Sequence, residues 1–304
     1  MVDKDFELII EKNQQRMSRL KTWVEQLASF KRSNKLNRAK KAKREGFDSV
    51  NEYMDFLKQK ADSETKTESK APELTDMVIA FDTTGSMRSY INDVKRHVNT
   101  LIPQLFEDNP NLKLSIVAFG DYCDMRTNTD FGNAYQVCDL TDNANVLMDF
   151  VTSARDTSGG DDPEFYELVI RKITQETNWR EGSNKSVLFI ADAVPHFENT
   201  YKSMNKTFID WKQEATEASK LGVKFDTLRI DKSVGWYKEL SEITNGVSLD
   251  FQSSGKTNDL VRASALARGG ESTAMLFKSL AVSDAVRGDS EMTAVYTMYK
   301  SVVE

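Results

Sequence analysis

Cysteine and histidine are scarce in this sequence, with two of each among 304 residues. Cys123 and Cys138 form neither a CxxC pair nor a zinc-ligand spacing, which excludes a structural zinc site. Both lie in or beside predicted strands, so a disulfide between neighbouring strands is the alternative to buried, reduced thiols. The lack of a secretory signal favours the reduced thiols. Neither His97 nor His196 stands in a recognisable nucleophile context, so no Ser-His-Asp constellation can be identified.

Long apolar runs are also missing. None approaches the roughly 18 residues that a membrane-spanning helix needs. The N-terminus, MVDKDFELII, carries acids where a signal peptide would be basic, and no small-residue cleavage site follows a long apolar stretch. Hydrophobic residues make up 39% of the chain and charged residues 29%, which is typical of a globular protein. We therefore expect a cytoplasmic protein with no membrane segment.

The net charge of −6 is unevenly distributed. Residues 1–70 carry 17 Lys and Arg against 12 Asp and Glu, a balance of +5, and the other 234 residues carry 24 against 35, a balance of −11. The chain thus has a basic N-terminal part and an acidic remainder. We expect an N-terminal helical segment over 1–60, a linker over 61–73, a main domain over 74–265 and a helical addition over 266–304.

The N-terminal part shows helical periodicity. Its apolar residues with heptad-like spacing are Phe6, Ile10, Met17, Leu20, Val24 and Leu27. This seam predicts a helix that closes a hairpin with the periodic segment 46–60 or pairs with a second subunit as a coiled coil. Between them, residues 31–45 carry eight basic residues and one acid. Such a run can neutralise phosphates, so nucleic-acid binding is an alternative function, although the lack of interleaved aromatics favours a solvated helix surface.

After the linker, apolar strand-like runs alternate with amphipathic helical segments, which indicates an α/β fold. The predicted strands are Met77–Asp82, Lys113–Phe119, Tyr135–Leu140, Ser186–Asp192, Val223–Ile230 and Val247–Phe251. The predicted helices are Met87–Phe106, Pro163–Thr177, Lys206–Leu221 and Val234–Thr244, with Gly222 and Gly246 as stop signals. We expect a doubly wound, mainly parallel six-stranded sheet with one antiparallel edge strand.

Polar residues follow two of these strands. The first strand ends in Asp82, with Thr84 and Ser86 two and four residues later, and the strand SVLFIAD ends in Asp192. Ligands collect at the carboxyl ends of parallel strands, so these side chains should meet. Carboxylate and hydroxyl oxygens are hard ligands that suit Mg²⁺, with Mn²⁺ or Ca²⁺ as alternatives. The sequence therefore predicts a divalent-cation site at this edge of the sheet.

A third loop contributes further acids. In DTSGGDDPEFYELV, Gly159 and Gly160 precede Asp161 and Asp162, and Pro163 stands at the natural first position of the following helix. Either acid could reach the same metal. Helix capping alone would also explain one of them.

Together the three loops resemble the von Willebrand factor type A domain with its metal-ion-dependent adhesion site. The first-loop pattern Asp-x-Ser/Thr-x-Ser is matched by Asp82, Thr84 and Ser86, the second loop aligns best through Asp161, and the third-loop Asp is matched by Asp192 in IADAVPH. The second loop departs from the usual Thr because it is acidic, GGDDPE. The resemblance covers about 74–265 and implies a Rossmann-like binding module. In this family an Asp or Glu of a protein partner completes the coordination of the metal.

Two enzyme interpretations are weaker. A haloacid-dehalogenase-like phosphatase needs an acid at position 84, where this chain has Thr. A phosphate-binding loop in DFQSSGKT, ending in Lys256 and Thr257, would need glycine where Asp250 stands. We therefore expect no catalytic activity. His196 either contacts a ligand of the metal or is a loop residue without a role at the site. The polar loop 121–133 either influences which partner binds or is a solvent-exposed loop without a binding role.

Overall fold

The computed structural model describes residues 73–127, 129–160, 163–204, 206–230, 235–250 and 254–304. The predicted N-terminal helices, the basic run and most of the linker lie outside the described residues, and so do Asp161 and Asp162. Interpretations that rest on them stay predictions, as do the domain boundaries. Among the described helices, none combines the length and the apolar character needed to cross a membrane.

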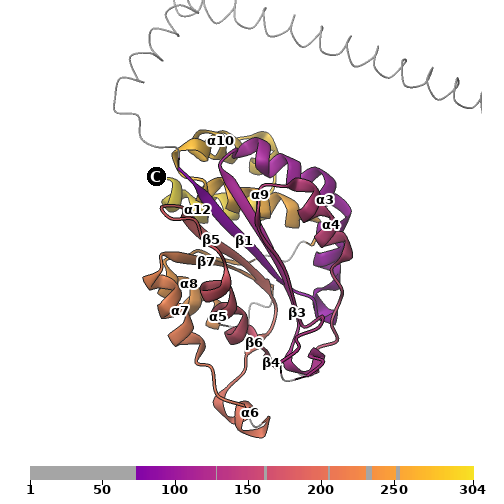
Figure 1. Cartoon of the computed structure of the whole chain (residues 1–304). Helices are drawn as coiled ribbons and strands as arrows, with labels where there is room; N and C mark the ends of the chain where they lie inside the picture. The colour runs from indigo at the N-terminus through magenta and orange to yellow at the C-terminus, as the bar shows by residue number, and fades with distance from the viewer. Residues whose placement is uncertain (1–72, 128, 161–162, 205, 231–234, 251–253) are drawn as a thin grey trace, which may run out of the picture. The chain divides into compact units, whose positions relative to one another are not determined.

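A six-stranded sheet forms the centre of the described structure, in the order β3-β2-β1-β5-β7-β8 (Figure 1). Its strands are β1 (Thr75–Asp82), β2 (Leu112–Phe119), β3 (Tyr135–Thr141), β5 (Asn184–Ala191), β7 (Val223–Arg229) and β8 (Ser248–Asp250). Only β2 and β3 pair antiparallel; the other neighbours in this sheet are parallel. This confirms the predicted mainly parallel sheet with one antiparallel edge strand.

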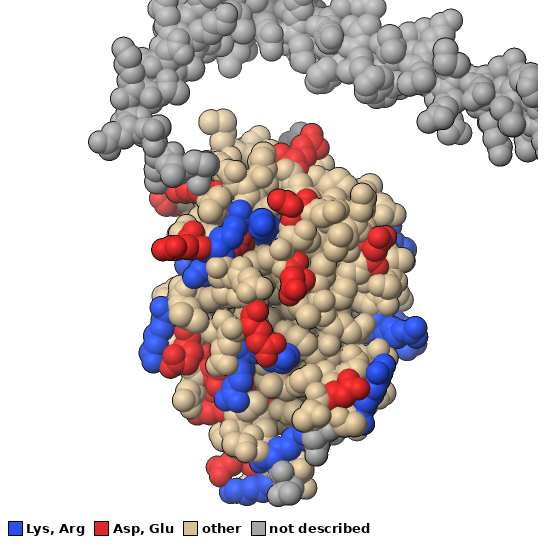
Figure 2. Space-filling model, in the orientation of Figure 1, with Lys and Arg blue, Asp and Glu red and all other residues tan. Residues whose placement is uncertain are grey.

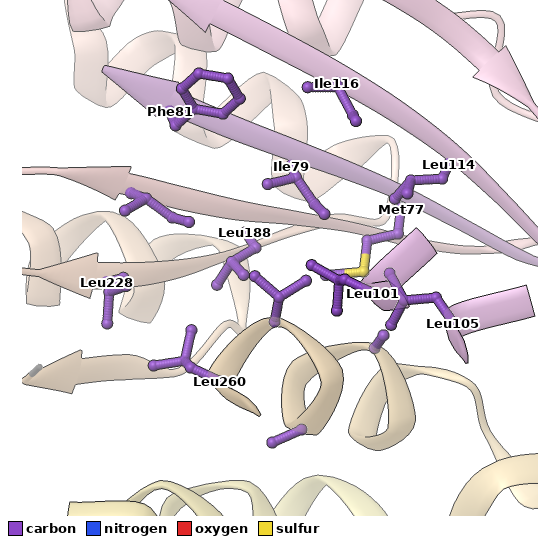
Figure 3. Close-up of a cluster of buried hydrophobic side chains, with 14 of the residues drawn as sticks. Met77, Ile79, Phe81, Leu101, Leu105, Leu114, Ile116, Leu188, Leu228 and Leu260 are labelled. Carbon is purple, nitrogen blue, oxygen red and sulfur yellow. The ribbon is translucent and has the colours of Figure 1, made fainter. Parts of the chain in front are cut away.

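The strands are apolar along nearly their whole length because both faces of the sheet are covered. In β1, Met77, Ile79 and Phe81 join the core on one face, whereas Val78 and Ala80 join the core on the other. Figure 3 shows the first of these cores, in which side chains of β1, β2 and β5 meet leucines of two helices. A run such as MVIAF can fill both cores because successive side chains point to opposite faces.

Helices cover each face. On the first lie α3 (Arg88–Asp108), α4 (Ala144–Ser153) and α9 (Thr257–Arg268), with α10 (Glu271–Ala281), α11 (Asp284–Arg287) and α12 (Ser290–Val303) following in the chain. On the second lie α5 (Tyr166–Glu176), α7 (Trp211–Lys220) and α8 (Trp236–Thr244). The short α6 (Glu198–Ser203) lies beyond the carboxyl ends of the strands (Figure 1).

Some predicted boundaries are wrong. Pro163 does not open a helix: Pro163–Glu164 is a short strand, β4, that pairs with β6 (Val194–Pro195), and α5 begins at Tyr166. α4 and α6 were not predicted. α8 ends at Thr244, as predicted, but the left-handed residue that caps it is Asn245, with a φ of 56°, rather than Gly246. Gly246 is required for a different reason, because its Cα packs directly on the backbone of β7.

The order of the strands also places the candidate site. β1 pairs with β2 on one side and with β5 on the other, so the chain reverses its direction of winding between β1 and β5. A crevice forms at the carboxyl ends of the two strands where such a reversal occurs. Asp82 ends β1 and Asp192 follows β5 directly.

Replacing Gly246 by alanine should destabilise the protein by about 3 kcal/mol or more, because strain from overpacking adds to a clash with backbone. A Cβ at this position would lie 1.8 Å from the backbone oxygen of Phe225. The control is Gly235→Ala, where a Cβ would meet nothing within 4 Å. Urea unfolding measures both variants, and equal stabilities would contradict the close approach.

Candidate functional site

Asp82 is a fully buried carboxylate at the carboxyl end of a central strand. Its Oδ1 accepts a hydrogen bond from the backbone N–H of Thr84 at 2.7 Å, and its Oδ2 accepts one from the hydroxyl of Tyr166 at 2.5 Å. Among the described residues, no lysine or arginine pairs with it. Burial raises the pKa of Asp82 to about 7, the nearby charge of Asp192 adds to the rise, and the two hydrogen bonds offset only part of it.

The two hydroxyls predicted beside Asp82 lie close together. Thr84 Oγ1 and Ser86 Oγ are 3.5 Å apart, where the chain turns from β1 into the 3₁₀ turn Gly85–Met87. Thr84 is buried and Ser86 is exposed. The first loop therefore offers a buried carboxylate, a buried hydroxyl and a hydroxyl that faces solvent.

Tyr166 joins the first loop to the third. Its buried hydroxyl donates to Asp82 and accepts a hydrogen bond from the backbone N–H of Ala193 at 3.3 Å. The carbonyl oxygen of Ala193 in turn accepts hydrogen bonds from Trp236 and Tyr237 at 2.9 and 2.8 Å. The third loop, which carries the half-buried Asp192, is thus fixed on the side that faces Asp82. Tyr166 was not predicted as a site residue, because a tyrosine on an apolar helix face has the usual pattern of a residue of the hydrophobic core.

The second loop is tied to the first by threonines. Thr83 Oγ1 and Thr157 Oγ1 lie 2.9 Å apart, and the backbone N–H of Thr157 donates to the carbonyl of Thr83 at 3.1 Å. Asp124, from the predicted polar loop 121–133, accepts hydrogen bonds from the backbone N–H groups of Ser158 and Gly159 at 2.9 and 3.2 Å. Burial opposes ionisation of Asp124, but these hydrogen bonds prevail and lower its pKa. Part of the polar loop therefore anchors the second loop.

Glu164 is a further acid next to this site. It is 4% exposed, and a Cβ built on Gly159 would lie 2.7 Å from its Oε1 and 3.1 Å from Cγ2 of Thr84. Glu164 and Thr84 thus approach the same glycine from two sides. The φ of +59° at Gly159 is a second reason for glycine there. Asp161 and Asp162, the predicted second-loop ligands, lie outside the described residues. Glu164 is a buried acid that follows them in the chain.

The donor set suits a small hard cation. Within the described part of the chain, no cluster of three or more His, Cys, Asp or Glu side chains is arranged to hold a metal ion. Hydroxyls make up half of the four described candidate ligands, which are Asp82, Thr84, Ser86 and Asp192. A buried carboxylate with a raised pKa and no basic partner is the kind of group that a cation stabilises, so the residues present fit Mg²⁺.

His196 lies in a buried cluster with Asp121 and Glu167. Its Nε2 is 3.6 Å from Oδ1 of Asp121 and its Nδ1 is 3.7 Å from Oε1 of Glu167. Glu167 accepts hydrogen bonds from the hydroxyls of Tyr201 and Tyr122 at 2.6 and 3.2 Å, and from the backbone N–H of His196 at 3.0 Å. This cluster fixes the position of the loop that carries Asp192.

The remaining chemical candidates take structural roles. Lys256 pairs with Asp289 at 2.5 Å, so it is engaged by an acid rather than turned toward a phosphate site. Cys123 and Cys138 are both free, as predicted; Cys138 is buried, but Cys123 is exposed, contrary to the prediction.

Comparisons with known proteins identify a domain family for most of the described residues. Residues 76–262 match the von Willebrand factor type A domain family. A putative ariadne-like RING finger protein of Acanthamoeba polyphaga mimivirus is 24% identical over 195 residues, which cover 59% of this chain and 18% of that protein. The match therefore spans less than a fifth of that relative's length.

Similar folds occur in solved structures. The crystal structure of the SpRpn10 VWA domain has a TM-score of 0.43 and 16% identity, over 62% of this chain and 94% of that one. The pilus adhesin SpaC from Lactobacillus rhamnosus GG has a TM-score of 0.48 and 12% identity, over 66% of this chain and 31% of that one. At such low identity the likeness concerns the fold alone.

Glu167→Gln should remove part of the pH dependence of stability. Burial raises the pKa of Glu167 from 4.5 to about 7, against the hydrogen bonds from Tyr201, His196 and Tyr122. The folded state thus binds this proton more tightly than the unfolded chain, and stability falls as pH rises between these two values. Above pH 7 the free energy of unfolding of the variant should therefore be larger than that of the wild type by up to about 3 kcal/mol.

Urea unfolding over a pH series measures this difference. Glu181→Gln is the matched control, because Glu181 is exposed. The other titratable groups in this cluster are Tyr122, Tyr201, His196 and Asp121, and all of them remain in the two variants. A Glu167→Gln curve parallel to that of the wild type would contradict the raised pKa.

Proposed function

The chain belongs to the von Willebrand factor type A domain family, and we propose that it binds a protein partner through a divalent cation at the carboxyl end of its sheet. Domains of this family mediate protein binding and often hold a divalent cation at a metal-ion-dependent adhesion site. The observation that carries the proposal is the buried Asp82 carboxylate, which has no basic partner among the described residues and lies beside the paired hydroxyls of Thr84 and Ser86.

In this proposal the metal ligands come from three loops. They are Asp82, Thr84 and Ser86 from the first, Asp161 from the second, and Asp192 from the third, with Mg²⁺ as the ion and Mn²⁺ or Ca²⁺ as alternatives. Glu164 joins the candidates for the second loop because of its burial next to Gly159 and Thr84. A divalent ion held by an incomplete set of fixed oxygens attracts a carboxylate, so an Asp or Glu of the partner would complete the set.

Binding is better supported than catalysis. Phosphoryl-transfer chemistry of the phosphatase type needs an acid at position 84, and Thr84 supplies only a hydroxyl. The buried His196 lies next to two acids, Asp121 and Glu167. Neither arrangement offers a nucleophile with an adjacent base.

Adding Mg²⁺ to metal-stripped protein should raise its melting temperature, because a ligand that binds only the folded state stabilises it. At 100 times the dissociation constant, the gain is about 2.7 kcal/mol. Asp82→Asn keeps the size of the side chain but removes its charge, and it should abolish most of this response. Calorimetric titration with Mg²⁺ gives the affinity directly.

Asp139→Asn is the control, because Asp139 is an exposed acid on the edge strand β3. It should respond to Mg²⁺ as the wild type does. An Asp82→Asn variant that responds as strongly as the wild type would refute the proposed site. Pull-downs in Mg²⁺ and in chelator, with wild type and Asp82→Asn in parallel, then test whether partner binding requires the metal.

A further inference from the structure

A second polar cleft lies at the opposite end of the sheet, where β5 and β7 begin. It has a volume of about 320 Å³, and its lining includes Ser186, Lys224, Arg268, Asn184 and Glu73. We call it the amino-end cleft. Asp82 and Asp192 lie at the carboxyl ends of the strands, so this cleft is separate from the candidate metal site.

Two residues form the floor of the amino-end cleft. Ser186 of β5 and Lys224 of β7 are direct partners in the parallel register. Because side chains alternate along a strand, both point to the face on which Leu188 and Leu228 join the first core. A hydroxyl and an ammonium group thus lie side by side beneath the ends of α9 and α12.

Neither floor group forms a hydrogen bond or an ion pair among the described residues. Ser186 is 1% exposed, and its Oγ has no hydrogen bond. Lys224 is half-buried and forms no ion pair or hydrogen bond there. Burial and the nearby positive charge of Arg268 lower the pKa of Lys224, and the attraction of Asp226 offsets only part of this effect. A buried hydroxyl without a partner is costly, and so is a desolvated ammonium group, so a missing acceptor would stabilise both.

The nearest buried carboxylate is already engaged. Asp226 accepts hydrogen bonds from the guanidinium group of Arg268, from Tyr299 at 3.1 Å and from the backbone N–H of Val247 at 2.8 Å. Arg268 therefore sits fixed at the wall of the cleft and adds positive charge next to Lys224. Asp226 also attracts Lys224, but it offsets the fall of the lysine's pKa only in part and accepts no hydrogen bond from it.

The upper wall of the cleft already holds a carboxylate. The N-terminus of α10 points into it, and the backbone N–H of Glu271 donates to Oε2 of Glu73 at 2.9 Å. Gly270, with a φ of +72°, lets this carboxylate approach, since a Cβ there would lie 1.9 Å from Oε2 of Glu73. An oxyanion thus occupies one side of the cleft, while the cationic floor has none.

The geometry points to the amino-end cleft as a binding site for a small ligand with an oxyanion group, phosphate or carboxylate. The oxyanion accepts from Ser186 Oγ and Lys224 Nζ, with Arg268 at its side. The volume is within the range of small-molecule sites. Glu73, Glu271 and Glu304 also line the cleft and restrict it to ligands whose anionic end reaches the floor.

General attraction of anions does not account for this arrangement. On the face shown in Figure 2, acidic and basic side chains are interspersed, without a broad basic patch. The net charge of −6 repels anions at long range. Binding of an anion therefore depends on the local groups of the floor, which makes it sensitive to single substitutions.

The test uses the full chain with inorganic phosphate as one probe and acetate as the other, at constant ionic strength set by chloride. Calorimetric titration and melting temperatures are measured for wild type, Ser186→Ala, Lys224→Met and the surface control Lys238→Met. One probe should bind the wild type and raise its melting temperature, which also distinguishes phosphate from carboxylate. Lys224→Met should weaken that binding about tenfold or more, and Lys238→Met should leave it unchanged.

Ser186→Ala separates the proposal from a general salt effect. Removing an unpartnered hydroxyl should raise the melting temperature without ligand, yet the rise produced by the ligand should shrink. Glu73→Gln should bind the anion more tightly, because a competing negative charge is removed. Equal responses of wild type and Lys224→Met to both probes, or no response of the wild type to either, would overturn the proposal.

Discussion

The hydroxyl of Tyr166 is the contact on which the arrangement of the candidate site depends. It donates to Oδ2 of Asp82 and accepts from the backbone of Ala193, so one buried oxygen connects the loop after β1 with the loop after β5. Tyr166 is fixed by packing against Phe119, Phe189 and Trp236. The rigid aromatic layer between sheet and α5 therefore sets the distance between the loops that carry Asp82 and Asp192.

The same contact shows why the negative charge of Asp82 is not neutralised. Asp82 receives hydrogen bonds from a tyrosine and a backbone N–H, which are neutral donors and cannot neutralise a buried carboxylate. Its raised pKa follows from this deficit. Either a proton or a cation can make up the missing positive charge, and a cation would do so near neutral pH. This is the physical link between the fold and the proposed metal-dependent binding.

The amino-end cleft shows the reverse situation. There a desolvated ammonium group and an unpartnered hydroxyl lie on adjacent strands, and the nearby Asp226 accepts its hydrogen bonds from Arg268, Tyr299 and Val247 instead. Each end of the sheet thus contains a buried polar group that the described residues satisfy incompletely: Asp82 has hydrogen bonds but no basic partner, and Ser186 has no hydrogen bond. Buried polar groups are normally paired, so such exceptions are the strongest structural indications of ligands.

Much of the fold followed from the sequence, because alternation along strands and acids at strand ends are local patterns. The strands of the main sheet, the antiparallel edge and the placement of Asp82 and Asp192 at neighbouring strand ends could be predicted in this way. The start of α5 could not be predicted, because Pro163–Glu164 pairs with Val194–Pro195, a segment 31 residues further along the chain. Tyr166, Asp124 and the Ser186–Lys224 pair were likewise decided by tertiary structure, since a hydrogen bond or its absence depends on what folding brings next to each side chain.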